Sequence, residues 1–215
     1  MRLAPLALLL LLPACHPRYK HAAPTLGAVR VQTLGTGTPY VNLGKVYTDS
    51  NDAPVAQIAA AVINTVQVVK EIDRTERIAG AVRTGEVKRA LSAGLQEAMG
   101  DGPPFAITED GGVGNVFQIE VLSYGLNVPW LGAPGSFTYD LRLRIYQADG
   151  RRVYAGRHHC DARAGNPSIA EQALFVVDNV RNLDEMSDDE ISGAFETIAF
   201  WCGEEIVAKL RRQAG

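Results

Sequence analysis

The sequence lacks the short motifs that mark common catalytic sites. It contains no serine in a glycine elbow, no His-Glu-x-x-His helix and no Walker loop. Its acidic clusters, at 109–110 and 184–190, fit turns and helix caps, whereas paired catalytic carboxylates need burial that raises one pKa. We therefore predict no catalytic residue and no cofactor. A hydrolase whose site is assembled from distant residues is kept as a second alternative.

The sequence also lacks an excess of positive charge and, beyond residue 12, a long hydrophobic run. Its 21 Lys and Arg residues are outnumbered by 24 Asp and Glu residues, which gives a formal net charge of −3. A nucleic-acid-binding protein would concentrate a basic excess on one face, so we predict no nucleic-acid partner. A membrane span needs about twenty apolar residues, so we predict none in the folded part.

The first fifteen residues, in contrast, carry a clear pattern. Arg2 is followed by an apolar run from Leu3 to Leu12 and by small residues before Cys15. A positively charged start, a core of about ten apolar residues and a small-residue cut site are the features of a secretory signal. The core is too short for a membrane span. We predict that residues 1–14 are a signal peptide and are removed.

The end of this signal, Leu12-Pro13-Ala14-Cys15, resembles the lipobox of bacterial lipoproteins. The resemblance implies that Cys15 becomes the first residue and carries fatty-acyl chains such as palmitate, and that His16 directs the protein to the outer membrane. Several acyl chains anchor a protein stably, whereas one chain does so only marginally. The resemblance therefore implies a membrane partner through the lipid anchor and a position on the outer membrane, facing the periplasm.

Residues 15–27 are expected to tether the lipid to a single α+β domain over residues 28–215. The tether is polar, contains Pro17 and Pro24 and has no periodicity. The Gly35-Thr36-Gly37 sequence follows a predicted first strand at 28–34. It lacks the third glycine and the following helix that a phosphate site requires, so none is predicted there.

Two amphipathic helices are predicted before residue 100. The first begins near Pro54 and has an apolar stripe at spacings of three and four, formed by Val55, Ile58, Val62, Val66, Val69 and Ile72. We interpret the stripe as a face that packs on the core of the same chain. Because its spacing is nearly heptad, a seam for a partner helix is the alternative. The second helix covers 86–99, with Val87, Leu91, Leu95 and Ala98 facing inward.

From residue 105 the apolar period changes to two, which predicts strands at 105–108, 116–124 and 137–145. The Asp149-Gly150 pair predicts a two-residue hairpin turn after the last of these. The resulting register sets Tyr139 opposite Cys160, Leu141 opposite His158 and Arg142 opposite Arg157. It also lets His159 pair with Asp140 across the strands.

Two C-terminal helices are predicted, one from Ser168 to about Arg181 and one from about Asp188 to Arg212, each beginning at a capping box. The stripe of the second comprises Ile191, Phe195, Ile198, Cys202 and Ile206. The fold class is thus α+β in two layers, a small and mostly antiparallel sheet covered by amphipathic helices, with a C-terminal helical pair.

Cys160 and Cys202 both face the interface between sheet and helix in this fold. In an oxidising compartment they are predicted to form a disulfide. Two buried free thiols are one alternative. A metal site that uses His158, Cys160 and Cys202 is another, but three ligands are too few for a closed structural zinc site. We therefore predict no metal.

Two surfaces are candidates for binding a partner. One is the outer face of the hairpin, where Arg142, Arg144 and Arg157 come together, unless carboxylates such as Glu120 and Asp140 pair with them. The other is the apolar connection at 127–134, which contains Trp130 and Leu131 and either folds over the sheet edge or stays exposed.

Residues 86–162 resemble accessory lipoproteins of envelope export and lipid-transport machines, including auxiliary lipoproteins of ABC transporters and the lipopolysaccharide-assembly lipoprotein. The helix that ends in Ala90–Met99, the strand Phe117–Leu122 and the hairpin strand from Tyr139 to Gly150 carry the similarity. It implies a helix packed on a small sheet and a non-enzymatic role with an envelope protein partner. The first alternative is a lipoprotein that binds a lipid or another apolar ligand.

Overall fold

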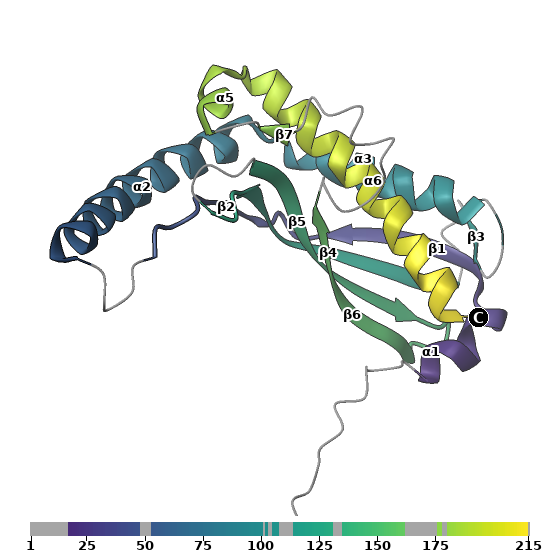
Figure 1. Ribbon diagram of the computed structural model, residues 1–215. Coiled ribbons are helices and arrows are strands. Elements are labelled where there is room, and N and C mark those ends of the chain that lie inside the picture. Colours follow the sequence, from purple (N-terminus) through teal and green to yellow (C-terminus); the bar gives the residue numbers. More distant parts are fainter. Residues whose placement is uncertain are drawn as a thin grey trace, which may run out of the picture.

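The computed structural model describes residues 17–47, 53–100, 102, 105–107, 114–130, 135–161, 176–177 and 180–214. It has two layers, a twisted sheet and a pair of long helices that cover one of its faces (Figure 1). A third long helix leaves the body at one end. The predicted fold class, α+β in two layers, is therefore confirmed.

The sheet is mixed and not mostly antiparallel. Its main path is β3-β1-β4-β5-β6, comprising Phe105–Ile107, Gly27–Leu34, Asn115–Asn127, Gly135–Tyr146 and Arg152–Asp161. β1 pairs in parallel with both β3 and β4, whereas β4, β5 and β6 are antiparallel neighbours. Two short strands, β2 (Thr38–Asn42) and β7 (Val176–Val177), join the sheet beside β4 and β5.

β2, which the sequence did not predict, continues the path of β1 along β4. Between the two strands the chain kinks at Gly35 and Gly37, whose φ angles are 73° and 69°. A side chain at Gly35 would place its Cβ 2.7 Å from the Val121 carbonyl oxygen, beside the bulge between Val121 and Ser123. The Gly-x-Gly sequence therefore serves close backbone packing at a strand kink.

The hairpin of β5 and β6 has the predicted register as far as Ile145, but not the predicted two-residue turn. The pairing shifts at Tyr146, which faces Arg152, and the Gln147 nitrogen donates to the Arg151 carbonyl, so the loop has three residues. Tyr139 lies opposite Cys160, Leu141 opposite His158, and Arg142 opposite Arg157. The predicted pairing of His159 with Asp140 is also present, with 2.9 Å between Nδ1 and Oδ1. The turn places Gly150 at a φ of 81°, a backbone conformation that glycine adopts without strain.

The two covering helices are α3 (Thr84–Gly100) and α6 (Asp188–Ala214). The side chains predicted to face inward from both helices are all buried. Where the helices cross, glycines replace side chains on both sides. A Cβ at Gly94 would lie 2.0 Å from the Phe200 carbonyl oxygen, and one at Gly203 would lie 2.5 Å from the Leu95 nitrogen. The helices therefore approach each other backbone to backbone.

The predicted capping box is present at the start of α6. The Glu190 carboxylate accepts hydrogen bonds from the Ser187 backbone nitrogen at 2.7 Å and from its hydroxyl at 2.8 Å, and the Glu190 nitrogen donates to Ser187 Oγ. These bonds favour the charged carboxylate and hold the pKa of Glu190 below its ordinary value of 4.5. They satisfy amides that the first helical turn leaves unpaired.

Replacing this serine, Ser187→Ala, is expected to lower the free energy of unfolding by about 1 kcal/mol at neutral pH, the usual cost of losing an N-cap. The pKa of the Glu190 carboxyl is lowered in the folded state. Its hydrogen bonds with Ser187 therefore stabilise the fold at pH values above the ordinary pKa of 4.5, and this stabilisation is lost as the pH falls through the folded pKa. The difference between the two proteins is therefore expected to shrink between about pH 7 and about pH 3. Urea unfolding at both pH values measures it, and a difference that grows on acidification would contradict the capping role.

A disulfide joins Cys160 of β6 to Cys202 of α6, as predicted, with a Cα–Cα distance of 5.8 Å and a sequence separation of 42. It ties the last long helix to the last strand of the hairpin. Because both sulfurs are used in this bond, the alternative metal site with His158 is not formed. His158 is buried, and its ring lies 3.3 Å from the Tyr154 hydroxyl.

Two segments differ from the sequence-based expectations. Residues 17–25, expected to be part of an irregular tether, form the helix α1 (Pro17–Ala22) and a 3-10 turn, η1 (Ala23–Thr25). The helix predicted from Ser168 to about Arg181 is wrong at its end, because Val176–Val177 form β7 and a helix, α5 (Val180–Glu185), begins only after it. Its first part, at 168–175, lies outside the described residues. Pairing with the start of β5 outweighs the local helical pattern here.

Candidate docking surface

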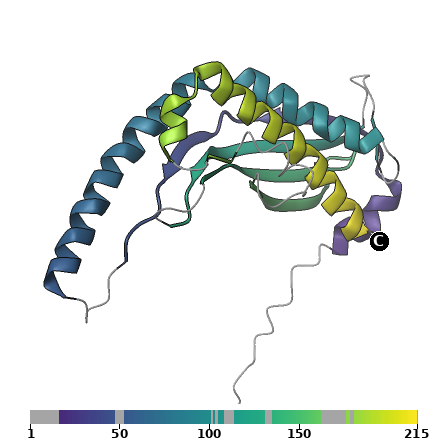
Figure 2. The same cartoon turned by 45° about the horizontal axis from the view of Figure 1, so that its top comes forward.

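The most unusual part of the molecule is α2 (Pro54–Ala81), a helix of 28 residues that extends away from the sheet as an arm. Figure 2 shows its first half well clear of the two-layer body, at the end opposite α1 and the C-terminus. At 1.5 Å per residue the helix is about 42 Å long. No charged residue occurs between Pro54 and Val69. Among the described helices, α2 alone is long and apolar enough to cross a membrane by length and composition.

The apolar stripe of α2 is exposed, contrary to the interpretation that it packs on the core. Its members, which we call the arm stripe, are between 49% and 77% exposed: Val55, Ile58, Val62, Val66, Val69 and Ile72. Isolated exposed apolar side chains are normal on a monomer, but a continuous stripe of six along five turns marks an interaction surface. The alternative of a seam for another helix therefore gains support.

The reason for this exposure is the rotation of the helix about its axis. The residues of α2 that are buried against the rest of the chain recur every seven positions, at Ala60, Gln67 and Arg74, and continue at Ile78 and Ala81. A seven-residue interval returns to nearly the same side of a helix, and these positions lie opposite the arm stripe. The face of the helix that contacts its own chain, which includes Gln67 and Arg74, is therefore the one opposite the arm stripe.

Polar contacts hold α2 in this orientation. The Asn64 side-chain amide exchanges hydrogen bonds with the backbone of Val46, at 2.9 and 3.0 Å, and the Glu71 carboxylate accepts one from the Leu43 nitrogen at 2.7 Å. Nearer the body, the buried Arg74 donates to both oxygens of Asp184, at 3.0 and 2.5 Å. A bidentate pair of this kind fixes geometry.

A further arginine of α2, Arg77, donates to the backbone carbonyls of Asp184 and Met186. Together with Arg74 it attaches the base of the arm to the turn between α5 and α6. The arm is therefore fixed at its base and along one face, while its opposite face is open to contact.

The predicted partner-binding residue Trp130 is 64% exposed and follows the end of β4 that pairs with β2, the strand that contacts α2. It follows Val128, whose nitrogen donates to the Asn42 carbonyl at the end of β2. The segment that follows Asn42 runs along α2 to Tyr47, which is also strongly exposed. Leu131, the second residue predicted in this connection, lies outside the described residues. Trp130, Tyr47 and the arm stripe thus occupy the same pole of the molecule, which we call the arm pole.

The predicted arginine surface on the outer face of the hairpin is largely neutralised. Arg142 and Arg144 both contact the Glu120 carboxylate, at 3.1 and 3.4 Å. Arg157 is exposed and lies opposite Arg142. Arg142 and Arg144 therefore pair with a carboxylate on a solvated face, which is the alternative considered from the sequence. Such half-exposed ion pairs contribute little to stability or to partner attraction.

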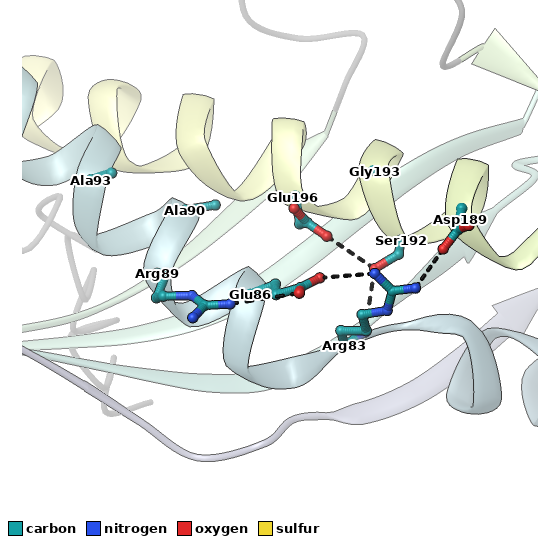
Figure 3. Close-up of a pocket in the computed structure, with 9 residues that line it drawn as sticks. All are labelled: Arg83, Glu86, Arg89, Ala90, Ala93, Asp189, Ser192, Gly193 and Glu196. Atoms are coloured by element: carbon teal, nitrogen blue, oxygen red, sulfur yellow. Dashed lines mark hydrogen bonds and ion pairs between the residues drawn. The ribbon is translucent and has the colours of Figure 1, made fainter.

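A shallow groove of about 780 Å³ runs between α3 and α6, and Figure 3 shows the charged side chains that line it. Arg83 contacts Asp189 at 2.5 Å and Glu86 at 3.6 Å, and Arg89 also contacts Glu86 at 3.6 Å. The positive and negative groups of this groove are therefore paired with one another. The Arg83–Asp189 pair links the starts of α3 and α6, and the charged groups do not converge on an empty centre.

The opposite end of the molecule, which we call the anchor pole, holds α1. Tyr19 is fully buried there, and its hydroxyl donates to the Leu210 carbonyl near the end of α6 at 3.2 Å. Around it lie exposed basic side chains from α1 and the hairpin, which are Arg18, Lys20, His21, Arg151 and Arg152. Pro17 starts α1 only two residues after Cys15, a reach of about 7 Å. A lipid on Cys15 would therefore lie close to this pole.

Two buried tyrosines of the body act as neutral hydrogen-bond donors. Burial raises the pKa of Tyr139 well above its ordinary value, and its hydroxyl donates to the Phe195 carbonyl at 3.0 Å. The pKa of Tyr19 is raised for the same reason. Within the described ranges, no three His, Cys, Asp or Glu side chains are grouped as metal ligands.

Neither a protein-family model nor a curated protein matches the chain. Several solved structures are similar to it, and the following three are among them. A protein of family DUF330 from Xanthomonas campestris matches at 11% identity and a TM-score of 0.40, covering 89% of this chain and 88% of its own. A hypothetical protein from Chlamydia trachomatis matches at 10% identity and a TM-score of 0.36, over 87% and 97% of the two chains.

The third is the lipoprotein GNA1162 from Neisseria meningitidis, at 14% identity and a TM-score of 0.24, over 69% of this chain and 92% of that one. Likeness at this level of identity and superposition assigns no function. The properties of the chain itself therefore carry the argument that follows.

Proposed function

We propose that the protein is a lipid-anchored accessory protein of the cell envelope that acts by docking to another envelope protein through its arm pole, without catalysing a reaction. The observation that carries this proposal is the exposed apolar surface of that pole, formed by the arm stripe, Tyr47 and Trp130. Exposure of this extent is costly in water unless another molecule covers it.

The position of the two poles supports this role. The first described element, α1, lies at the anchor pole and begins at Pro17, two residues after Cys15 in the sequence. Acyl chains on Cys15 would hold that pole against the bilayer, and its basic side chains suit an anionic lipid surface. The arm pole at the other end of the body then points away from the anchoring membrane, where a protein partner can reach it.

The packing of the body supports docking over the binding of a lipid inside the fold. The centre of the interface between sheet and helices is occupied by aromatic rings, with Phe137 and Tyr139 of β5 at 4.7 and 5.6 Å from Phe195 of α6. Tyr124 of β4 contacts the same ring at 5.4 Å. Aromatic packing of this density leaves the arm pole as the apolar surface available to a partner.

The test is photo-crosslinking from position 130 of the full-length chain in intact cells, with the crosslinker in place of Trp130. We expect one envelope protein to be captured well above its abundance in the membrane. When that protein is tagged, it is expected to recover this chain, and Trp130→Ala is expected to reduce the recovery by about tenfold, as for an aromatic hot spot.

The matched control carries the crosslinker at Arg152, an exposed residue of the anchor pole, and is expected to capture no such protein. A parallel Cys15→Ser variant is expected to leave the membrane fraction and to lose the crosslink. Recovery of the protein itself alone, or of other proteins only in proportion to their abundance, would refute docking to another envelope protein.

A further inference from the structure

The arm stripe has the sequence pattern of a seam between identical helices. Counted in heptads from Val55, the first positions are Val55, Val62 and Val69, and the fourth positions are Ile58, Thr65 and Ile72. The residues buried against the rest of the chain, Ala60, Gln67 and Arg74, then occupy the sixth position of each heptad, on the opposite side of the helix. The seven-residue repeat thus places the residues that contact the same chain on one face of α2 and the exposed arm stripe on the opposite face.

We infer that a second copy of this chain covers the arm stripe, through parallel packing of the two α2 helices. This inference rests on the proposed function in taking the arm pole as the contact surface. It assigns the arm stripe to self-association and leaves Trp130 for the other envelope protein. Branched residues at both seam positions are compatible with two or three helices in the bundle.

The absence of charge along the seam favours an identical partner. Between Pro54 and Val69 the positions that flank the seam are Ala59, Ala61, Val66 and Val68, with no acidic or basic side chain. Two copies of such a surface do not repel each other, and alanines allow their backbones to approach closely. A seam for a specific foreign helix commonly carries charges at these flanking positions, which select the partner.

The single polar residue of the seam is already satisfied within its own helix. The Thr65 hydroxyl donates to the Ala61 carbonyl at 2.8 Å, so its burial between two helices would leave no donor unpaired. The first charged residues at a flanking and at a seam position are Asp73 and Glu76, which lie at the base, where the arms meet their bodies. The seam therefore extends from Val55 to Ile72, a length of about 26 Å.

The same features argue against a membrane as the cover of α2. Its uncharged stretch of sixteen residues from Pro54 to Val69 spans about 24 Å, less than the roughly 30 Å of a bilayer core. Asn64 holds the backbone of Val46 beside the helix, so an irregular segment would have to enter the bilayer with it. A helix lying on a membrane surface would carry Lys and Arg on its polar face, which this stretch lacks.

Anchoring supports parallel pairing and strengthens it. Copies held to the same membrane by their anchor poles direct their arms the same way, so Val62 of one copy meets Val62 of the next. A seam of fewer than three heptads is weak in dilute solution. Confinement to a membrane raises the local concentration of the copies and therefore the fraction that is paired.

The test uses two differently tagged full-length chains expressed together and purified through one tag from solubilised membranes. Unmodified chains are expected to co-purify. When both copies carry Val62→Glu, co-purification is expected to fall by about tenfold or more, because like charges would meet inside the seam. When one copy carries Val62→Glu and the other Val62→Lys, co-purification is expected to return. Only contact between two copies predicts this rescue.

The control is Ile63→Glu in both copies, which makes a similar change at the next residue, outside the seam, and is expected to leave co-purification unchanged. Val62 and Ile63 are both exposed, so the thermal unfolding midpoint of either variant is expected to match that of the unmodified chain. Absence of co-purification between unmodified chains, an equal loss with Ile63→Glu, or failure of the Glu and Lys pair to recover would overturn the inference.

The two proposals fail separately. If unmodified chains do not co-purify but position 130 still captures another envelope protein, self-association is refuted and docking stands. If the copies pair through Val62 but position 130 captures no other protein, docking to another envelope protein is refuted and self-association stands.

Discussion

Replacing Gly203 by alanine is expected to lower the free energy of unfolding by about 2 kcal/mol, with a loss of several degrees in the melting midpoint. The new Cβ would lie 2.5 Å from the Leu95 nitrogen and 2.8 Å from the Leu91 carbonyl oxygen, both backbone atoms of α3. Backbone atoms inside a helix cannot rotate away as a side chain can, so α3 and α6 must separate. Separation opens the core that both helices cover, and this cost exceeds the helix-forming advantage of alanine.

The control for this prediction lies in the same helix. Among the described residues, no atom outside the local backbone of α6 lies within 4 Å of the position where a Cβ of Gly193 would be built. Gly193→Ala is therefore expected to raise the free energy of unfolding by about 0.5 to 1 kcal/mol, the difference in helix propensity between the two residues. Urea unfolding of the three proteins measures both effects. If the two substitutions change stability in the same direction and by similar amounts, the close crossing of α3 and α6 is refuted.

Elements with a complete local signal were predictable from the sequence. The alternation from Phe137 to Ile145 predicted the register of the hairpin as far as Ile145, because a shift by one residue would turn every apolar side chain to solvent. The two-residue turn was wrong, since the loop has three residues, 148–150, and a register shift at Tyr146 compensates for the extra one. The capping box at Ser187 and Glu190 and the apolar spacing that follows it fixed the start and the buried face of α6. These signals act between residues close in sequence or directly opposite each other.

Elements that depend on distant contacts were not predictable. β2 contains Pro39 and is only five residues long, and it exists because it pairs with the second half of β4. β7 likewise forms by pairing with the start of β5. The helix at α1 is short, and Tyr19 stabilises it by reaching a carbonyl that is 191 residues away. A short segment of this kind takes its structure from its partner.

The orientation of α2, which exposes the docking surface, also depends on contacts between residues far apart in the sequence. Periodicity identified the stripe of α2 correctly but did not indicate which side of the helix the body would occupy. The contacts that decide it are polar, namely Asn64 with Val46 and Arg74 with Asp184. A helix with an apolar face and a second face that bonds to its own chain has two interaction surfaces, and hydrophobicity reports only one of them. The prediction that the apolar stripe of α2 packs on the core was wrong because it assumed that the apolar face of a helix is always the buried face.

Removal of the disulfide is expected to have the largest effect on stability. Closing a loop of about 42 residues stabilises a fold by about 4 kcal/mol in the chain-entropy treatment. Cys160→Ala and Cys202→Ala are each expected to lower the free energy of unfolding by about this amount, a large share of the 5 to 15 kcal/mol of a typical domain. The double variant is expected to lose little more than either single variant, because both substitutions remove the same bond.

Denaturant unfolding with and without reductant measures this effect, and intact mass provides its chemical counterpart. Reduction is expected to add about two daltons to the unmodified protein, for the two hydrogens that the sulfurs gain, and to lower its stability to that of the double variant. The double variant itself is expected to respond to reductant in neither measurement, which separates loss of the bond from a general effect of the reductant. A mass that does not change on reduction would show that the two thiols are free. Additive losses in the double variant would show that each sulfur stabilises the fold by its own packing. The bond joins α6 to the strand beside the outer arginine surface, so its loss releases the long helix that α3 crosses at Gly94 and Gly203.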